Sequence, residues 1–158
     1  MKQVVYIETS VISYLTSRPS RDIVVAAHQQ VTRDWWEQRR EDFVLIASEL
    51  VAREAGAGDA DAAEQRIAAL IDVNLVSGTE EALSLAEALV AHGAVPSSAP
   101  EDALHIAIAA AAGAEYLLTW NCKHIANATC RATIEVVCRK RGYEPPILCT
   151  PLELLEVC

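Results

Sequence analysis

The stretch that decides the fold is Val4-Val5-Tyr6-Ile7-Glu8-Thr9-Ser10-Val11-Ile12, close to the start of the chain. Its first four residues are apolar and mostly β-branched, which predicts a central, buried strand. Thr9 or Ser10 can accept a hydrogen bond from the first free amides of a following helix. Glu8 is therefore expected at the carboxyl end of a strand, where open α/β sheets place their ligand sites.

The rest of the chain alternates short apolar runs with segments of helical period. Further strands are expected at 43–46, 73–76, 116–120 and 147–150, and helices at 9–16, 21–39, 49–55, 59–71, 79–93, 100–113, 127–141 and 152–155. Short strands that alternate with helices indicate a parallel sheet covered on both faces. The expected fold class is α/β, a three-layer α/β/α arrangement with a parallel sheet of about five strands, in a single domain spanning residues 1–158.

Composition narrows the class of protein. A hydrophobic content of 52% in 158 residues and a mean hydropathy of +0.18 argue against disorder. The chain has no apolar run of about 18 residues that could span a bilayer, and its first residues lack a signal-peptide layout. The five cysteines form no Cys-x-x-Cys pair, and an odd count without a secretion signal indicates free thiols and a cytoplasmic location.

The formal charge of −9 is unfavourable for nonspecific binding of nucleic-acid phosphates. Basic residues do cluster locally, at Arg131, Arg139, Lys140 and Arg141, with Lys123 and His124 nearby in the sequence. The cluster is either a local phosphate-binding surface or a solvated helix end whose charge complements the helix dipole.

Polar side chains follow two of the expected strands, and an acidic side chain lies at the start of an expected helix. Glu8 follows the first strand, and Asn121 follows the strand at 116–120. Asp102 lies in the first turn of a helix that Pro100 opens, where an acid also stabilises the helix dipole. Asp102 becomes a candidate site residue only if its side chain lies close to those of Glu8 and Asn121; otherwise it is an acid that stabilises the start of a helix.

Two glutamates, Glu49 and Glu54, follow the second strand. Five residues of helix rotate about 140°, so the two side chains cannot face the same point, and one of them is the site candidate. Converging carboxylates raise one another's pKa unless a cation intervenes. All-oxygen ligands favour Mg²⁺ or Mn²⁺ over zinc, for which Cys122 and His124 offer only half a site. His105, among apolar neighbours, is predicted to be a packed core histidine.

Four motifs, in chain order, resemble the PIN domain, and most closely the VapC-like toxin ribonucleases of bacterial toxin–antitoxin pairs. They are Tyr6-Ile7-Glu8-Thr9-Ser10-Val11-Ile12, Ser48 to Glu54, Asp102-Ala103-Leu104-His105-Ile106-Ala107 and Leu118-Thr119-Trp120-Asn121. The resemblance implies that the first and fourth strands are neighbours, with Glu8 beside Asn121. It implies catalytic residues at Glu8, Glu54, Asp102 and Asn121, and Mg²⁺ or Mn²⁺ held by Glu8, Glu54 and Asp102.

The function that the resemblance implies is a metal-dependent endoribonuclease, in which the cation activates water for attack on an RNA phosphodiester. An antitoxin protein is the implied partner. Most relatives carry Asp in place of Glu8 and commonly Asp in place of Asn121, and the neutral Asn should weaken a second metal more than the first. The alternative is a non-catalytic PIN scaffold that binds RNA or a partner protein. A flavodoxin-like receiver is set aside, because the paired acids after the first strand and the Lys after the fifth are missing.

A homodimer is also expected. Trp35 and Trp36 give the helix at 21–39 apolar surface on more than one side, and exposed aromatic patches usually mark contacts.

Overall fold

The computed structural model describes the whole chain, from Met1 to Cys158. One sheet of five parallel strands has the order β3-β2-β1-β4-β5. The strands are β1 (Val4–Ile7), β2 (Val44–Ser48), β3 (Asn74–Val76), β4 (Tyr116–Leu118) and β5 (Ile147–Cys149). β1 is the central strand and pairs with both β2 and β4, which confirms the predicted neighbours.

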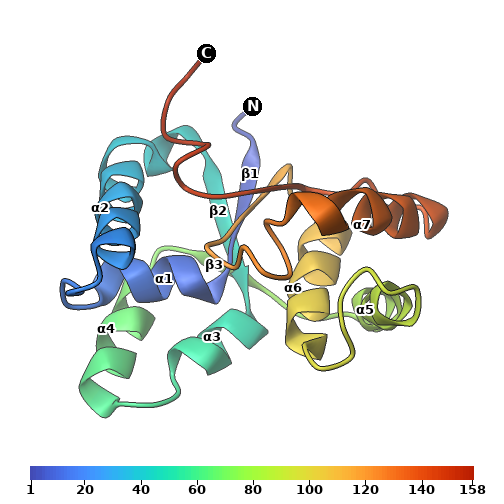
Figure 1. The fold of residues 1–158 in the computed structure, drawn as a ribbon, viewed down its shortest axis with the longest axis horizontal. Coiled ribbons are helices and arrows are strands. Elements are labelled where there is room, and N and C mark those ends of the chain that lie inside the picture. Colours follow the sequence, from blue (N-terminus) through green and yellow to red (C-terminus); the bar gives the residue numbers. More distant parts are fainter.

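Helices cover both faces of this sheet (Figure 1). The α-helices are α1 (Thr9–Thr16), α2 (Ile23–Gln38), α3 (Glu49–Ala55), α4 (Ala60–Ala69), α5 (Glu80–Ala91), α6 (Pro100–Ala111) and α7 (Ala128–Lys140), and a 3₁₀ turn, η1, spans Arg40–Asp42. Right-handed crossovers place α1 to α4 on one face and α5 to α7 on the other, as Figure 1 shows. The three-layer α/β/α fold expected from the sequence is confirmed.

The core forms where the helix layers meet the sheet. Val5, Tyr6 and Ile7 are completely buried, as a central strand requires. Burial raises the pKa of the Cys138 thiol to about 11 and that of Cys149 to about 12, and all five cysteines are free. No helix combines the length and the apolar character needed to cross a membrane.

Capping and turn residues in the sequence predicted most helix ends to within one or two residues of their observed positions. Thr79 caps α5 as expected, and Gly113 has a φ of +73° just beyond α6, where a side chain would be strained. The last expected helix, 152–155, is wrong. Its amides bond to carbonyls only three residues back, so the segment is a series of turns.

The start of α1 and the end of β4 also differ from expectation. The N-cap of α1 is Glu8 rather than Thr9 or Ser10, because its carboxylate accepts the Ser10 amide hydrogen. The Ser10 hydroxyl instead accepts from the amide of Trp120 at 2.8 Å. β4 ends at Leu118 rather than at Trp120, whose amide therefore bonds to a side chain and not to a neighbouring strand.

The two tryptophans of α2 have different surroundings. Trp35 is fully buried and stacks on Phe43, with 6.0 Å between ring centroids. Trp36 is only partly buried, and the Arg40 guanidinium lies over its ring at 4.5 Å. Trp35 therefore contributes no outer surface. The exposed apolar side chains of α2 are Ile23 and Val24 at its amino end, and the homodimer stays a prediction.

Candidate active site

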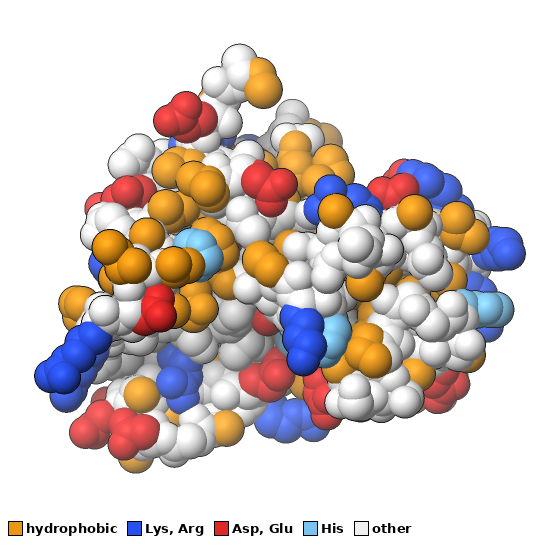
Figure 2. All heavy atoms as spheres, viewed as in Figure 1, with side chains coloured by type: hydrophobic (Ala, Val, Ile, Leu, Met, Phe, Trp, Pro, Cys, Tyr) orange, Lys and Arg blue, Asp and Glu red, His pale blue; other side chains and the backbone are white.

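A cleft of about 1070 Å³ opens beyond the carboxyl ends of the strands, between α3 on one side and α5 and α6 on the other. β1 and β4 are neighbours there, but the chain leaves them toward opposite faces of the sheet, so this is the topological switch point. Figure 2 shows the hollow between the two halves of the molecule, with acidic side chains along it. The cleft thus lies near the carboxyl edge of the sheet, where the sequence analysis expected a site.

Glu8 is almost entirely buried, with 6% of its surface exposed, and it does not line the cleft. Its carboxylate accepts the Ser10 amide hydrogen at 2.7 Å. Burial raises the pKa of Glu8, and the charge of Glu54 adds to this, whereas His105 and the Ser10 bond oppose it. The residue is therefore both a helix cap and a buried acid with a raised pKa.

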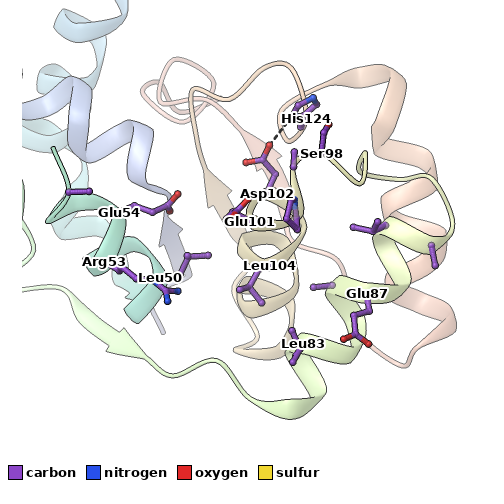
Figure 3. A pocket seen from close by; sticks show the side chains of 16 residues that line it. Leu50, Arg53, Glu54, Leu83, Glu87, Ser98, Glu101, Asp102, Leu104 and His124 are labelled. Carbon is purple, nitrogen blue, oxygen red and sulfur yellow. Dashed lines mark hydrogen bonds and ion pairs between the residues drawn. The ribbon is translucent and has the colours of Figure 1, made fainter.

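Glu54 lies on the α3 wall of the cleft (Figure 3). Its Oε1 accepts from the Thr9 hydroxyl at 2.8 Å and from Nε2 of His105 at 2.6 Å, while Oε2 has no partner within the chain. Burial alone would raise the pKa of Glu54, but the hydrogen bonds from His105 and Thr9 outweigh it and lower the pKa. The other candidate, Glu49, is exposed and bonds to Ser77.

Asp102 faces the same cleft from the first turn of α6, on the opposite wall from Glu54 (Figure 3). Its Oδ2 pairs with Nδ1 of His124 at 2.8 Å, and its Oδ1 has no partner within the chain. The Asn121 side-chain oxygen accepts the backbone amide hydrogen of His124 at 3.0 Å. Asn121 therefore shapes the loop that presents His124 to Asp102.

A chain of hydrogen bonds joins the predicted residues. Glu8 accepts from the Ser10 amide, and the hydroxyl of Ser10 bonds to that of Thr119 at 3.4 Å. Thr119 accepts the amide hydrogen of Asn121, which leads through His124 to Asp102. Glu54 joins from the other side through Thr9, the neighbour of Glu8. Hydrogen bonds thus run from Glu8 to Asn121 and Asp102 between the residue after β1, α1, the loop after β4 and α6, whereas Glu54 of α3 connects to Glu8 only through the backbone of Thr9.

Sequence reasoning missed the role of His105. The residue is 1% exposed, as expected of a core histidine, but both of its ring nitrogens are hydrogen-bonded: Nδ1 to the Tyr6 hydroxyl at 2.8 Å and Nε2 to Glu54. The one available signal was its position, three residues after Asp102 and so on nearly the same side of the helix.

The predicted basic cluster on α7 does not reach the cleft, whose lining contains Arg53 as its one Lys or Arg side chain. Arg139 forms ion pairs with Glu135 and Glu144, and Arg131 donates to the carbonyl of Leu148. The solvated helix end is therefore the better interpretation of that cluster.

No three Asp, Glu, His or Cys side chains lie close enough together to form a ready-made metal site. The chemistry of the donor set nevertheless fits Mg²⁺ or Mn²⁺, because Glu54 and Asp102 line one cleft and each keeps a carboxylate oxygen free of protein partners. Glu8, the third expected ligand, is buried and, like Asn121, does not line the cleft.

Comparison with known proteins supports the fold. No protein-family model matches the chain, and no curated protein sequence matches it. Two solved structures are similar at a TM-score of 0.59. Mycobacterium tuberculosis VapC20, described as a toxin that cleaves the sarcin-ricin loop, is 19% identical over 76% of this chain and 92% of its own. VapBC2 from Rickettsia felis, bound to a DNA fragment from its promoter, is 12% identical over 94% of this chain and 98% of the matched chain. These likenesses confirm the PIN-like fold expected from the sequence.

Proposed function

We propose that this protein is a metal-dependent endoribonuclease that hydrolyses RNA phosphodiester bonds. The observation that carries the proposal is the position of Glu54 and Asp102, which face one cleft at the switch point of a fold shared with VapC20. Each residue is oriented by a histidine, His105 or His124, and each keeps one oxygen free. A pair of acids held in this way is suited to bind a divalent cation.

The ligands in this proposal are Glu54 and Asp102, with Glu8 as the third acid of the site. When bound, Mg²⁺ or Mn²⁺ would activate water for attack on the phosphorus and neutralise charge that develops on the phosphate. Arg53 lines the cleft, and its positive charge supports a contact with an RNA phosphate oxygen in this proposal. Asn121 acts indirectly: its side-chain oxygen accepts the backbone amide hydrogen of His124 and so fixes the loop that carries this histidine.

The partners follow from the same similarity. VapC20 is described as a toxin, so we propose an antitoxin protein as the partner of this chain. Separately, we propose a homodimer as its own assembly. A gene for a small DNA-binding protein beside that of this chain would support the toxin assignment.

The test is cleavage of labelled RNA by the purified protein in Mn²⁺, in Mg²⁺ or in EDTA. Glu54→Gln and Glu49→Gln are matched variants, since both glutamates belong to α3 but only Glu54 lines the cleft. We expect cleavage in Mn²⁺ or Mg²⁺, none in EDTA, loss of cleavage in Glu54→Gln and wild-type cleavage in Glu49→Gln. RNA binding without cleavage under any condition would instead support the non-catalytic scaffold.

A further inference from the structure

A buried relay of hydrogen bonds ends on Glu54. The Ser48 hydroxyl bonds to the Tyr6 hydroxyl at 2.7 Å, Tyr6 bonds to Nδ1 of His105 at 2.8 Å, and Nε2 of His105 bonds to Glu54 at 2.6 Å. Ser48, Tyr6 and His105 are at most 1% exposed. These side chains come from β1, the end of β2, α6 and α3, so the relay ties the oxygen of Glu54 to three other elements of the fold.

The relay has a direction. Oε1 of Glu54 accepts from the Thr9 hydroxyl at 2.8 Å, and a carboxylate oxygen is an acceptor, so we assign the hydrogen in the 2.6 Å contact to Nε2 of His105. When Nε2 carries the single ring proton, Nδ1 is an acceptor and the Tyr6 hydroxyl donates to it. Tyr6 in turn accepts from Ser48, whose oxygen also accepts the amide hydrogen of Val51 at 3.2 Å. Every donor therefore points toward Glu54.

The relay meets one oxygen of Glu54 only. His105 and Thr9 both donate to Oε1, and Oε2 is left without a partner on a residue that lines the cleft. A free glutamate side chain loses rotamer entropy when it is fixed. Donors that fix it in advance remove that cost from ligand binding.

We propose that His105 is the positioning residue of the site: it holds Oε1 of Glu54 so that Oε2 is presented to the divalent cation. This inference rests on the proposed function, since it needs a cation in the cleft. Hydrogen-bond partners of ligating carboxylates typically change metal affinity about 10–100-fold when they are removed.

Two matched variants of the full chain test the role. Gln in place of His105 keeps an amide hydrogen near the position of Nε2, whereas Asn keeps one only near the position of Nδ1. We expect His105→Asn to weaken Mn²⁺ binding about 10–100-fold by titration calorimetry, and His105→Gln to bind Mn²⁺ close to wild type. The melting temperature of each variant without metal reports how far loss of the imidazole disturbs the core.

The positioning role would be overturned if His105→Asn bound Mn²⁺ as tightly as the wild type, or if both variants bound it equally weakly. Either result would leave the proposed function in place. Failure of the wild type to bind Mn²⁺ would overturn the proposed function, and this inference with it. If the variants do not fold, ¹H–¹⁵N spectra of the wild-type histidines decide. We expect His105 to keep its proton on Nε2 with and without Mg²⁺, and a proton on Nδ1 alone would contradict the inference.

Discussion

Replacement of Asp102 by Asn is the most informative single change, because it removes a charge and almost nothing else. The volume is unchanged, and the Asn side-chain oxygen can still accept from Nδ1 of His124. Binding of the cation should weaken, because one of the two cleft-lining carboxylates proposed as ligands, Glu54 and Asp102, becomes neutral. A loss of about 3 kcal/mol of transition-state stabilisation corresponds to roughly 100-fold slower cleavage.

The effect on stability separates this change from a folding defect. A charge-assisted hydrogen bond contributes about 1.5–3 kcal/mol and a neutral one about 0.5–1.5 kcal/mol, so the change should cost about 1 kcal/mol. For a chain of this length that lowers the melting temperature by roughly 2–4 °C. If Asp102 were surrounded only by other acids, the Asp102→Asn change would leave stability equal or raise it, because repulsion between like charges would be relieved. The His124 pair reverses that expectation, and no cluster of three acids is present to be relieved.

The assay compares wild type and Asp102→Asn for RNA cleavage in Mn²⁺ and for melting with and without metal. Equal cleavage by both proteins would refute the mechanism. Absence of cleavage by either, with no shift in melting on addition of Mn²⁺, would favour the non-catalytic scaffold.

Three further predictions concern the apo protein. Burial raises the folded-state pKa of Glu8, so its ionisation costs stability as the pH rises through that value. Glu8→Gln in EDTA should therefore melt higher than wild type at pH 7 but not below about pH 4, near the unfolded pKa, and a difference independent of pH would contradict this. Ser48→Ala removes the partner of the Val51 amide and of Tyr6, and should cost about 1–3 kcal/mol in denaturant unfolding, whereas Ser48→Thr should cost less. Sedimentation should show a dimer at micromolar concentration, and a monomer would count against the expected assembly.

The sequence predicted the backbone of the site better than its side chains. The Val4–Ile7 run and the helix caps are local signals, and parallel strands that end at one edge bring Glu8 and Asn121 near each other whatever their side chains do. The partners of those side chains are not local. His105 meets Glu54 across 51 residues and Tyr6 across 99, and no periodicity encodes which nitrogen faces which oxygen. For the same reason the capping role of Glu8 was missed, since it depends on the rotamer of its own side chain.

The two carboxylate–histidine pairs suggest how ligand binding and stability are coupled. Glu54 belongs to α3, in the helix layer on one face of the sheet, and Asp102 to α6, in the layer on the other. A cation bound by both would link the two layers across the cleft, and binding to the folded state alone raises stability by RT ln(1 + [L]/Kd). A variant on either wall should therefore lose most of the metal-induced shift in melting even where its metal-free stability is close to wild type. A shift that survives in Glu54→Gln and in Asp102→Asn would mean that the cation binds elsewhere.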